Sequence, residues 1–93
     1  MNYLHSEFDL EAGDVLIVDL DGQANVLLMD RSNYEDYKEG RTYRYYGGLA
    51  EKTPARLAAP RSGRWYLVVD LGGYPGTVRA GVRVQKSGQV ATT

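Results

Sequence analysis

Apolar and polar residues alternate with a period of two along much of the chain, which is typical of strands with one buried face. Residues 3–10 alternate in this way, and residues 14–20 form a nearly continuous, β-branched apolar run. Asp21-Gly22 is suited to a tight hairpin, so we expect residues 24–29 to be the returning strand. The first thirty residues therefore predict three consecutive strands.

One helix is predicted after these strands. Ser32 and Glu35 have the spacing of a capping box, in which each side chain bonds to the backbone of the other residue. Tyr34 and Tyr37 are three residues apart and would share one face of a helix. We expect a short, two-turn helix near residues 33–39.

The second half of the chain predicts four more strands. Residues 42–46 resemble a strand that ends at Gly47-Gly48, and residues 54–59 form a weaker one. The strongest pattern is a hairpin of residues 65–70 and 77–84. In its second strand every other residue is apolar, so we expect one face in the core and the other in solvent.

About seven short strands separated by regular turns are typical of a β-sandwich or a small barrel. We therefore expect an all-β fold: a small β-sandwich, jelly-roll-like or a partly open barrel, with one short helix. A chain of 93 residues is too short for two independent cores. We place a single domain at residues 1–85 and a flexible C-terminal tail at residues 86–93.

The net charge of −1 hides an uneven distribution. Residues 1–40 carry ten acidic and two basic side chains, whereas residues 41–93 carry two acidic and nine basic ones. Either the two halves pair across one sheet and neutralise each other, or the molecule is dipolar and associates head to tail or with an acidic partner. Because the chain has no overall basic excess, we expect no nucleic-acid partner and no membrane partner.

The chain contains no cysteine, which excludes a disulfide framework, a thiolate nucleophile and cysteine metal ligands. The first residues have no basic segment followed by an apolar run of secretory length. No segment approaches the roughly 20 apolar residues of a membrane-spanning helix. We expect a cytoplasmic protein.

Residues that carry catalytic or metal chemistry are few and poorly spaced. His5 is the one histidine, and its neighbour Ser6 would point to the opposite face of a strand, so the two would not act as base and nucleophile. Hydrolysis would require a cleft around His5. Asp19 and Asp21 lack the further ligands of a calcium-binding loop. We therefore expect no catalytic residue, no metal site, no cofactor and no enzymatic activity.

Tyrosine and arginine carry the clearest functional signal. The eight tyrosines exceed what one small core can hide while every hydroxyl group finds a partner, so some must be exposed. Tyrosine and arginine are also enriched at interface hot spots. The alternative is that tyrosines line the sandwich edge and arginines stack on them structurally. We predict a binding surface, the predicted Tyr/Arg surface, formed by Arg44, Tyr45, Tyr46, Arg64, Trp65 and Tyr74.

Several short motifs lie between about residues 2 and 85 in a characteristic order. They are Tyr3-Leu4-His5, Ala12-Gly13-Asp14, Gln23-Ala24-Asn25-Val26, Leu28-Met29-Asp30, Ser32-Asn33, Arg44-Tyr45-Tyr46-Gly47-Gly48-Leu49-Ala50, Ser62-Gly63-Arg64-Trp65 and Val68-Val69-Asp70-Leu71-Gly72-Gly73-Tyr74. Together they resemble the bacterial DUF1883 family of uncharacterised small proteins. The resemblance implies a β-sandwich-like fold and supplies no catalytic residues. Members similar to this chain also occur fused to TIR-type domains, which implies a recognition or assembly role, and an adaptor role for a stand-alone copy.

The sequence thus predicts a non-enzymatic protein-interaction or adaptor module that binds a protein partner or a second copy of itself. A homodimer is compatible with exposed aromatic residues and oppositely charged halves. The alternative is a sensor domain for a small ligand, a carbohydrate or a nucleotide, linked by the family resemblance to TIR-type signalling.

Overall fold

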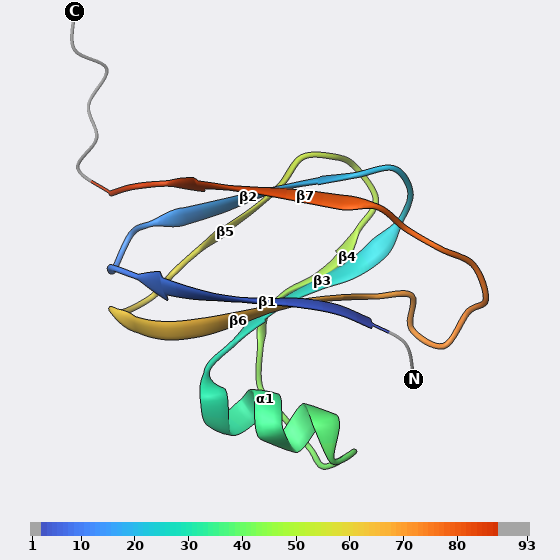
Figure 1. The fold of residues 1–93 in the computed structure, drawn as a ribbon, viewed down its shortest axis with the longest axis horizontal. Helices are drawn as coiled ribbons and strands as arrows, with labels where there is room; N and C mark the ends of the chain where they lie inside the picture. The colour runs from blue at the N-terminus through green and yellow to red at the C-terminus, as the bar shows by residue number, and fades with distance from the viewer. Residues whose placement is uncertain (1–2, 88–93) are drawn as a thin grey trace, which may run out of the picture.

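The computed structural model describes residues 3–87 and arranges them in three layers, a three-stranded sheet, a four-stranded sheet and one helix (Figure 1). The four-stranded antiparallel sheet has the order β1-β6-β3-β4, and the three-stranded antiparallel sheet has the order β5-β2-β7. This open sandwich confirms the predicted fold class. The elements are β1 (Tyr3–Leu10), β2 (Val15–Leu20), β3 (Ala24–Met29), α1 (Arg31–Lys38), β4 (Tyr46–Ala50), β5 (Ala55–Ala58), β6 (Gly63–Asp70) and β7 (Ala80–Gln85).

Strand β6 is buried on both faces because it lies between β1 and β3 and between two other layers. Trp65, Leu67 and Val69 face the three-stranded sheet and join the larger apolar cluster. Tyr66 and Val68 face α1 and join the smaller cluster. This double burial explains the continuous apolar run in β6, since a strand with only one buried face would alternate.

Helix α1 packs its two buried tyrosines, Tyr34 and Tyr37, on the four-stranded sheet. It begins two residues earlier than predicted because Asp30, and not Ser32, caps its N-terminus. The Oδ1 atom of Asp30 accepts a hydrogen bond from the backbone N–H of Asn33 at 3.0 Å. Within residues 3–87 no helix is long and apolar enough to cross a membrane.

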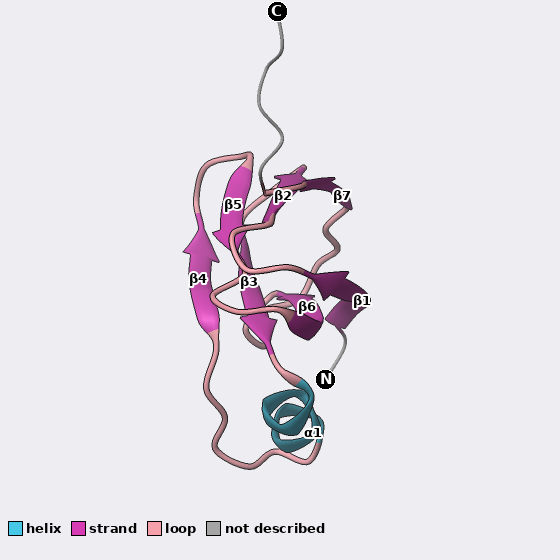
Figure 2. Cartoon of the chain, turned by 90° about the vertical axis from the view of Figure 1, so that its left-hand side faces the viewer, coloured by secondary structure: helices cyan, strands magenta, loops and turns pink. Residues whose placement is uncertain are grey.

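The prediction for residues 42–46 was wrong, since β4 begins only at Tyr46 and runs through the glycine pair that was expected to end it. Residues 41–45 instead form the link from α1 to the edge of the sheet (Figure 2). Gly47 allows the strand to continue because its φ is +115°, and a Cβ there would collide with the carbonyl oxygen of Val26 on β3.

Both predicted hairpins were also wrong. Strand β2 pairs with β5 and β7, whereas β3 pairs with β4 and β6, so the turn at Asp21-Gly22 crosses from one sheet to the other. Gly22 does not adopt a positive φ. In the same way β6 and β7 belong to different sheets, and β7 begins at Ala80, so residues 71–79 form a long crossing loop. The alternation predicted for this strand holds in part, because Ala80 and Val82 pack on the core.

Basic side chains of the second half of the sequence pair with acidic side chains of the first half, both within the sheets and in the segments that connect the elements. Five basic residues of the second half pair with acidic residues of the first half, whereas Lys38 and Glu35 pair within the first half. Within residues 3–87 the pairs between halves are Arg41 with Asp36, Arg61 with Asp30, Arg64 with Glu7 and Asp9, Arg83 with Asp19, and Lys86 with Asp14.

The predicted tail starts with two residues that are held by the fold. Asp14 is fully buried, and its carboxylate accepts hydrogen bonds from the backbone N–H of Ser87 at 2.6 Å and from Lys86 Nζ at 3.0 Å. The Ser87 N–H, with further help from the backbone N–H of Glu11 and from Lys86, lowers the pKa of Asp14 to about 2. The remaining part of the predicted tail, residues 88–93, lies outside the described residues.

Candidate functional site

Four of the six predicted surface residues meet in one depression beside the N-terminal end of α1. The depression has a volume of about 460 Å³ and lies between the end of β3, the link from α1 to β4, and the start of β6. We call it the Arg44 depression. Its lining residues are Met29, Asp30, Asn33, Arg44, Tyr45, Tyr46, Arg61 and Trp65.

The helix cap also fixes the position of Arg44. Asp30 Oδ1 accepts hydrogen bonds from the backbone N–H and the side-chain Nδ2 of Asn33, at 3.0 and 2.9 Å. Asn33 Oδ1 in turn accepts a hydrogen bond from the backbone N–H of Arg44 at 2.7 Å. The Arg44 side chain is exposed and takes no part in this chain of bonds, so the backbone holds its place while the guanidinium stays available.

Trp65 forms the floor of the depression and is itself only 2% exposed. Its Nε1 donates a hydrogen bond to the backbone oxygen of Arg61 at 3.0 Å, and the Arg61 guanidinium lies 4.9 Å from the ring centroid. The edge of the Tyr46 ring packs against it with the centroids 6.0 Å apart. Trp65 therefore supports Arg61 and Tyr46 from below, and a ligand would contact the guanidinium of Arg61 and the ring of Tyr46.

The lining of the depression holds two arginines and one aspartate, so positive charge is in excess. Arg61 Nη2 pairs with Asp30 Oδ2 at 2.9 Å. The pKa of Asp30 is lowered, mainly by the Asn33 N–H and also by Arg61, so this carboxylate stays ionised. Within residues 3–87, Arg44 has no carboxylate within 4.0 Å. One guanidinium is thus left over beside two half-exposed phenol rings, those of Tyr45 and Tyr46.

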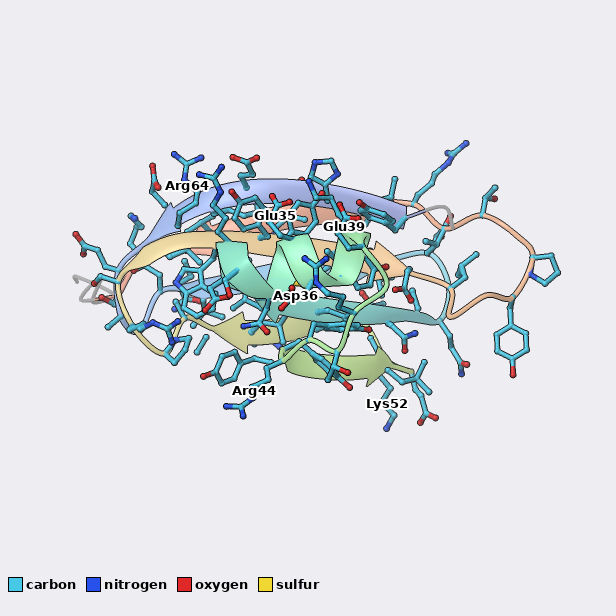
Figure 3. The ribbon with its side chains drawn as sticks, turned by 90° about the horizontal axis from the view of Figure 1, so that it is seen from below. Glu35, Asp36, Glu39, Arg44, Lys52 and Arg64 are labelled. Atoms are coloured by element: carbon cyan, nitrogen blue, oxygen red, sulfur yellow. The ribbon has the colours of Figure 1, made fainter. Side chains whose placement is uncertain are left out.

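The other two predicted residues lie elsewhere. Arg64 points to the β1 side, where it pairs with Glu7 and Asp9 at 2.8 Å each, and Figure 3 shows it across α1 from Arg44. Tyr74 is 79% exposed in the loop after β6. Trp65, near the start of β6, and Asp70, at its end, are about 17 Å apart, and Tyr74 lies in the loop beyond that end and does not line the depression. The six residues therefore do not form one surface.

His5 and Ser6 point to opposite faces of β1, as predicted. His5 lies opposite Val68 on the helix side, with its ring centroid 5.5 Å from that of Tyr34, whereas Ser6 lies opposite Leu67 on the side of the other sheet. Within the described part of the chain, no group of three His, Cys, Asp or Glu side chains is arranged to hold a metal ion.

A second cavity, of about 300 Å³, is also lined by Tyr45, and no sequence motif predicted it. We call it the Asp70 cavity. The spacing of the residues along β6 could have indicated this cavity. Tyr66, Val68 and Asp70 are two residues apart, so Asp70 shares the helix-facing side of the strand with the other two. Its lining residues are Asn25, Leu27, Tyr37, Tyr43, Tyr45, Gly48, Leu49, Asp70 and Gly72.

A family model described as a domain of unknown function, DUF1883, matches residues 1–88. The chain belongs to this family. The match spans nearly the whole sequence and confirms the resemblance seen in the short motifs. Comparisons with curated proteins and with solved structures found no match. The DUF1883 description names no activity.

Proposed function

We propose that this DUF1883 domain is a non-enzymatic protein-interaction module that binds a partner through the Arg44 depression. The observation that carries the proposal is the exposed Arg44 guanidinium, with no carboxylate partner within residues 3–87, next to the half-exposed rings of Tyr45 and Tyr46. Tyrosine and arginine dominate the energy of many protein interfaces because they combine a large apolar area with fixed polar groups. Arg61 adds a second guanidinium on the rim.

A partner segment with a carboxylate next to an apolar side chain fits this arrangement best. The planar guanidinium of Arg44 would bind a carboxylate through two parallel hydrogen bonds. The apolar side chain would lie against the rings of Tyr45 and Tyr46. Because both the charge and the rings are exposed before binding, we expect a transient, salt-sensitive complex.

Binding of a small carbohydrate or nucleotide is the second candidate. The volume of about 460 Å³ falls within the range of small-ligand sites, about 300 to 1,000 Å³. An aromatic pair beside an arginine also suits the stacking of a sugar ring or a base. A ligand of this kind would raise the melting temperature of the isolated domain, because it binds only the folded state.

Peptide selection on the purified domain tests the proposal. We expect a displayed random-peptide library to enrich segments that combine Asp or Glu with an apolar residue. Arg44→Ala and Tyr46→Ala should each weaken the binding of the selected peptides by about tenfold or more, which corresponds to the loss of one hot-spot side chain. Arg44→Ala should leave the fold intact, because Asn33 bonds to the backbone of Arg44 and not to its side chain.

Tyr74→Ala is the matched control, since Tyr74 is the most exposed tyrosine and lies outside the depression. Its variant should bind the selected peptides as the unmodified domain does. If the peptides bind equally well to all three variants, the Arg44 depression is not the interaction surface. If binding of pooled sugars or nucleotides raises the melting temperature and Tyr46→Ala removes that rise, the small-ligand candidate is favoured.

A further inference from the structure

We propose that the Asp70 cavity binds an organic ammonium ion, with a quaternary ammonium group preferred. The cavity combines a buried carboxylate that has no basic partner within residues 3–87 with three tyrosine rings. Its chemistry is opposite to that of the Arg44 depression, which would bind a negatively charged group. The inference is therefore independent of the proposed protein-interaction function.

The carboxylate of Asp70 is 5% exposed and is held by three hydrogen bonds. Oδ2 accepts from the hydroxyl of Tyr37 at 2.6 Å, and Oδ1 accepts from Asn25 Nδ2 at 2.9 Å and from the backbone N–H of Gly72 at 3.0 Å. All three donors are uncharged. Of the four acceptor positions of a carboxylate, one on Oδ2 is left. A quaternary ammonium group has no N–H to donate to it, so such a ligand would be attracted by the charge of the carboxylate alone.

The negative charge of Asp70 is not neutralised by the described part of the chain. Within residues 3–87 no Lys, Arg or His side chain lies within 4.0 Å of it. A buried carboxylate without a cationic partner is unfavourable unless hydrogen bonds or a bound cation compensate for the lost hydration. A cation entering the cavity would supply the missing charge.

The rings of Tyr37, Tyr43 and Tyr45 form a continuous aromatic wall. Tyr43 packs edge-on against Tyr37 with the centroids 5.0 Å apart, and it meets Tyr45 at 5.7 Å with a tilt of 42°. Burial, together with the nearby charge of Asp70, raises the pKa of both Tyr37 and Tyr43, so these phenols stay protonated and add no negative charge of their own. Neutral aromatic rings attract organic cations through the negative potential of their faces.

The lining selects an ammonium group over other cations. A guanidinium would need both carboxylate oxygens for its paired hydrogen bonds, but Oδ1 already has two donors. A divalent metal ion would need several oxygen ligands, whereas Leu27 and Leu49 are apolar, and the Asn25 side chain presents its nitrogen to Asp70. A weakly hydrated alkylammonium ion needs one charge and apolar or aromatic contacts, which this cavity provides.

An amide NMR titration with choline chloride tests the inference. We expect saturable shifts at the Asn25 side-chain amide and the Gly72 backbone amide, the two nitrogen donors to Asp70. The neutral analogue 3,3-dimethylbutan-1-ol has the same shape without the charge, and it should bind about tenfold or more weakly, as should sodium chloride at equal ionic strength. Equal shifts with the neutral analogue, or no saturable shift with choline, would overturn the proposal.

Two variants locate the site. Asp70→Asn keeps the shape of the side chain and removes its charge, and it should weaken the binding of choline by about tenfold or more. Tyr45→Leu should weaken the binding of choline several-fold. Because Tyr45 is half exposed, this variant should fold, and it keeps the test valid if Asp70→Asn does not fold. Glu51→Gln, which removes an exposed carboxylate outside the cavity, is the matched charge control and should bind choline normally. Unchanged choline binding by Tyr45→Leu would also overturn the proposal.

The same titration separates the two possible sources of the ammonium group. A peptide with a trimethyl-lysine that binds more tightly than choline would indicate a side chain of a protein, whereas tighter binding of choline would indicate a free small molecule. Arg44→Ala should retain choline binding in either case. Failure of the peptide selection at the Arg44 depression would therefore leave the choline result unaffected, and the reverse also holds.

Discussion

The hydrogen bond from Tyr37 to Asp70 should contribute more to stability than the hydrogen bond of Tyr34, the other tyrosine of α1. The Tyr37 hydroxyl and the Asp70 carboxylate are both buried, and the bond measures 2.6 Å. Tyr37→Phe removes the donor and keeps the ring that packs against Tyr3 and Tyr43. A hydrogen bond to a charged group contributes about 1.5 to 3 kcal/mol, so we expect the free energy of unfolding to fall by about 2 kcal/mol.

That change is large enough to measure by thermal unfolding. A chain of 93 residues gains about 0.2 kcal/mol/K of entropy on unfolding, at roughly 2.1 cal/mol/K per residue. A loss of about 2 kcal/mol therefore lowers the melting temperature by about 10 °C. Circular dichroism during heating, together with urea unfolding at pH 7, gives the melting temperature and the free energy of unfolding.

Tyr34→Phe is the matched control on the same helix. Tyr34 is as buried as Tyr37, but its hydroxyl meets the uncharged hydroxyl of Tyr3 at 3.3 Å. We expect this variant to lose about 0.5 kcal/mol, the low end for a neutral hydrogen bond. If Tyr37→Phe is no more destabilising than Tyr34→Phe, the buried bond from Tyr37 to Asp70 does not contribute the stability expected of it. A double-mutant cycle with Asp70→Asn should show a coupling of about 1 to 2 kcal/mol between the two residues.

Two further predictions concern acid stability and the glycine of β4. The pKa of Asp14 is lowered from 3.8 to about 2 in the folded state, so its contribution is present above about pH 4 and is lost as the pH falls toward 2. Urea unfolding of Asp14→Asn should therefore show a deficit against the unmodified protein that narrows between about pH 4 and pH 2, and a constant deficit would contradict this. Gly47→Ala should lower the free energy of unfolding by about 1 to 3 kcal/mol, since Gly47 has a positive φ and no room for a Cβ. Gly22→Ala, where the added methyl meets open space, should change it by less than about 0.5 kcal/mol, and equal losses in the two variants would argue against a strained Gly47.

Local sequence patterns were sufficient to identify most of the elements. The alternation in residues 3–10 and the apolar runs of β2, β3 and β6 depend only on which side chains a strand must bury, and the structure places strands at all of them. Tyr34 and Tyr37 were predicted to share a helix face, and both are buried together. The excess of tyrosines over core space correctly implied that some lie at the surface.

Capping and turn signals were less reliable because several residues near one position can play the same local role. Asp30 and Ser32 are both good N-caps, and only the path of the chain after β3 decides which residue precedes the first turn. Asp21-Gly22 suits a hairpin, but the same two residues can also join two sheets. The choice depends on which neighbours bury β2 and β3, and those neighbours, β5, β6 and β7, lie far along the sequence.

The sequence by itself thus indicated most of the strands, the helix and the family. Only the tertiary structure decided which residues share a surface. It placed Arg44 and Tyr46 in one depression with Arg61, paired Arg64 with acidic residues of β1, and brought Asp70 and Tyr45 to the same cavity. The physical reason is that strand pairing joins residues about 20 to 70 positions apart, and the choice among pairings depends on the burial of all seven strands together.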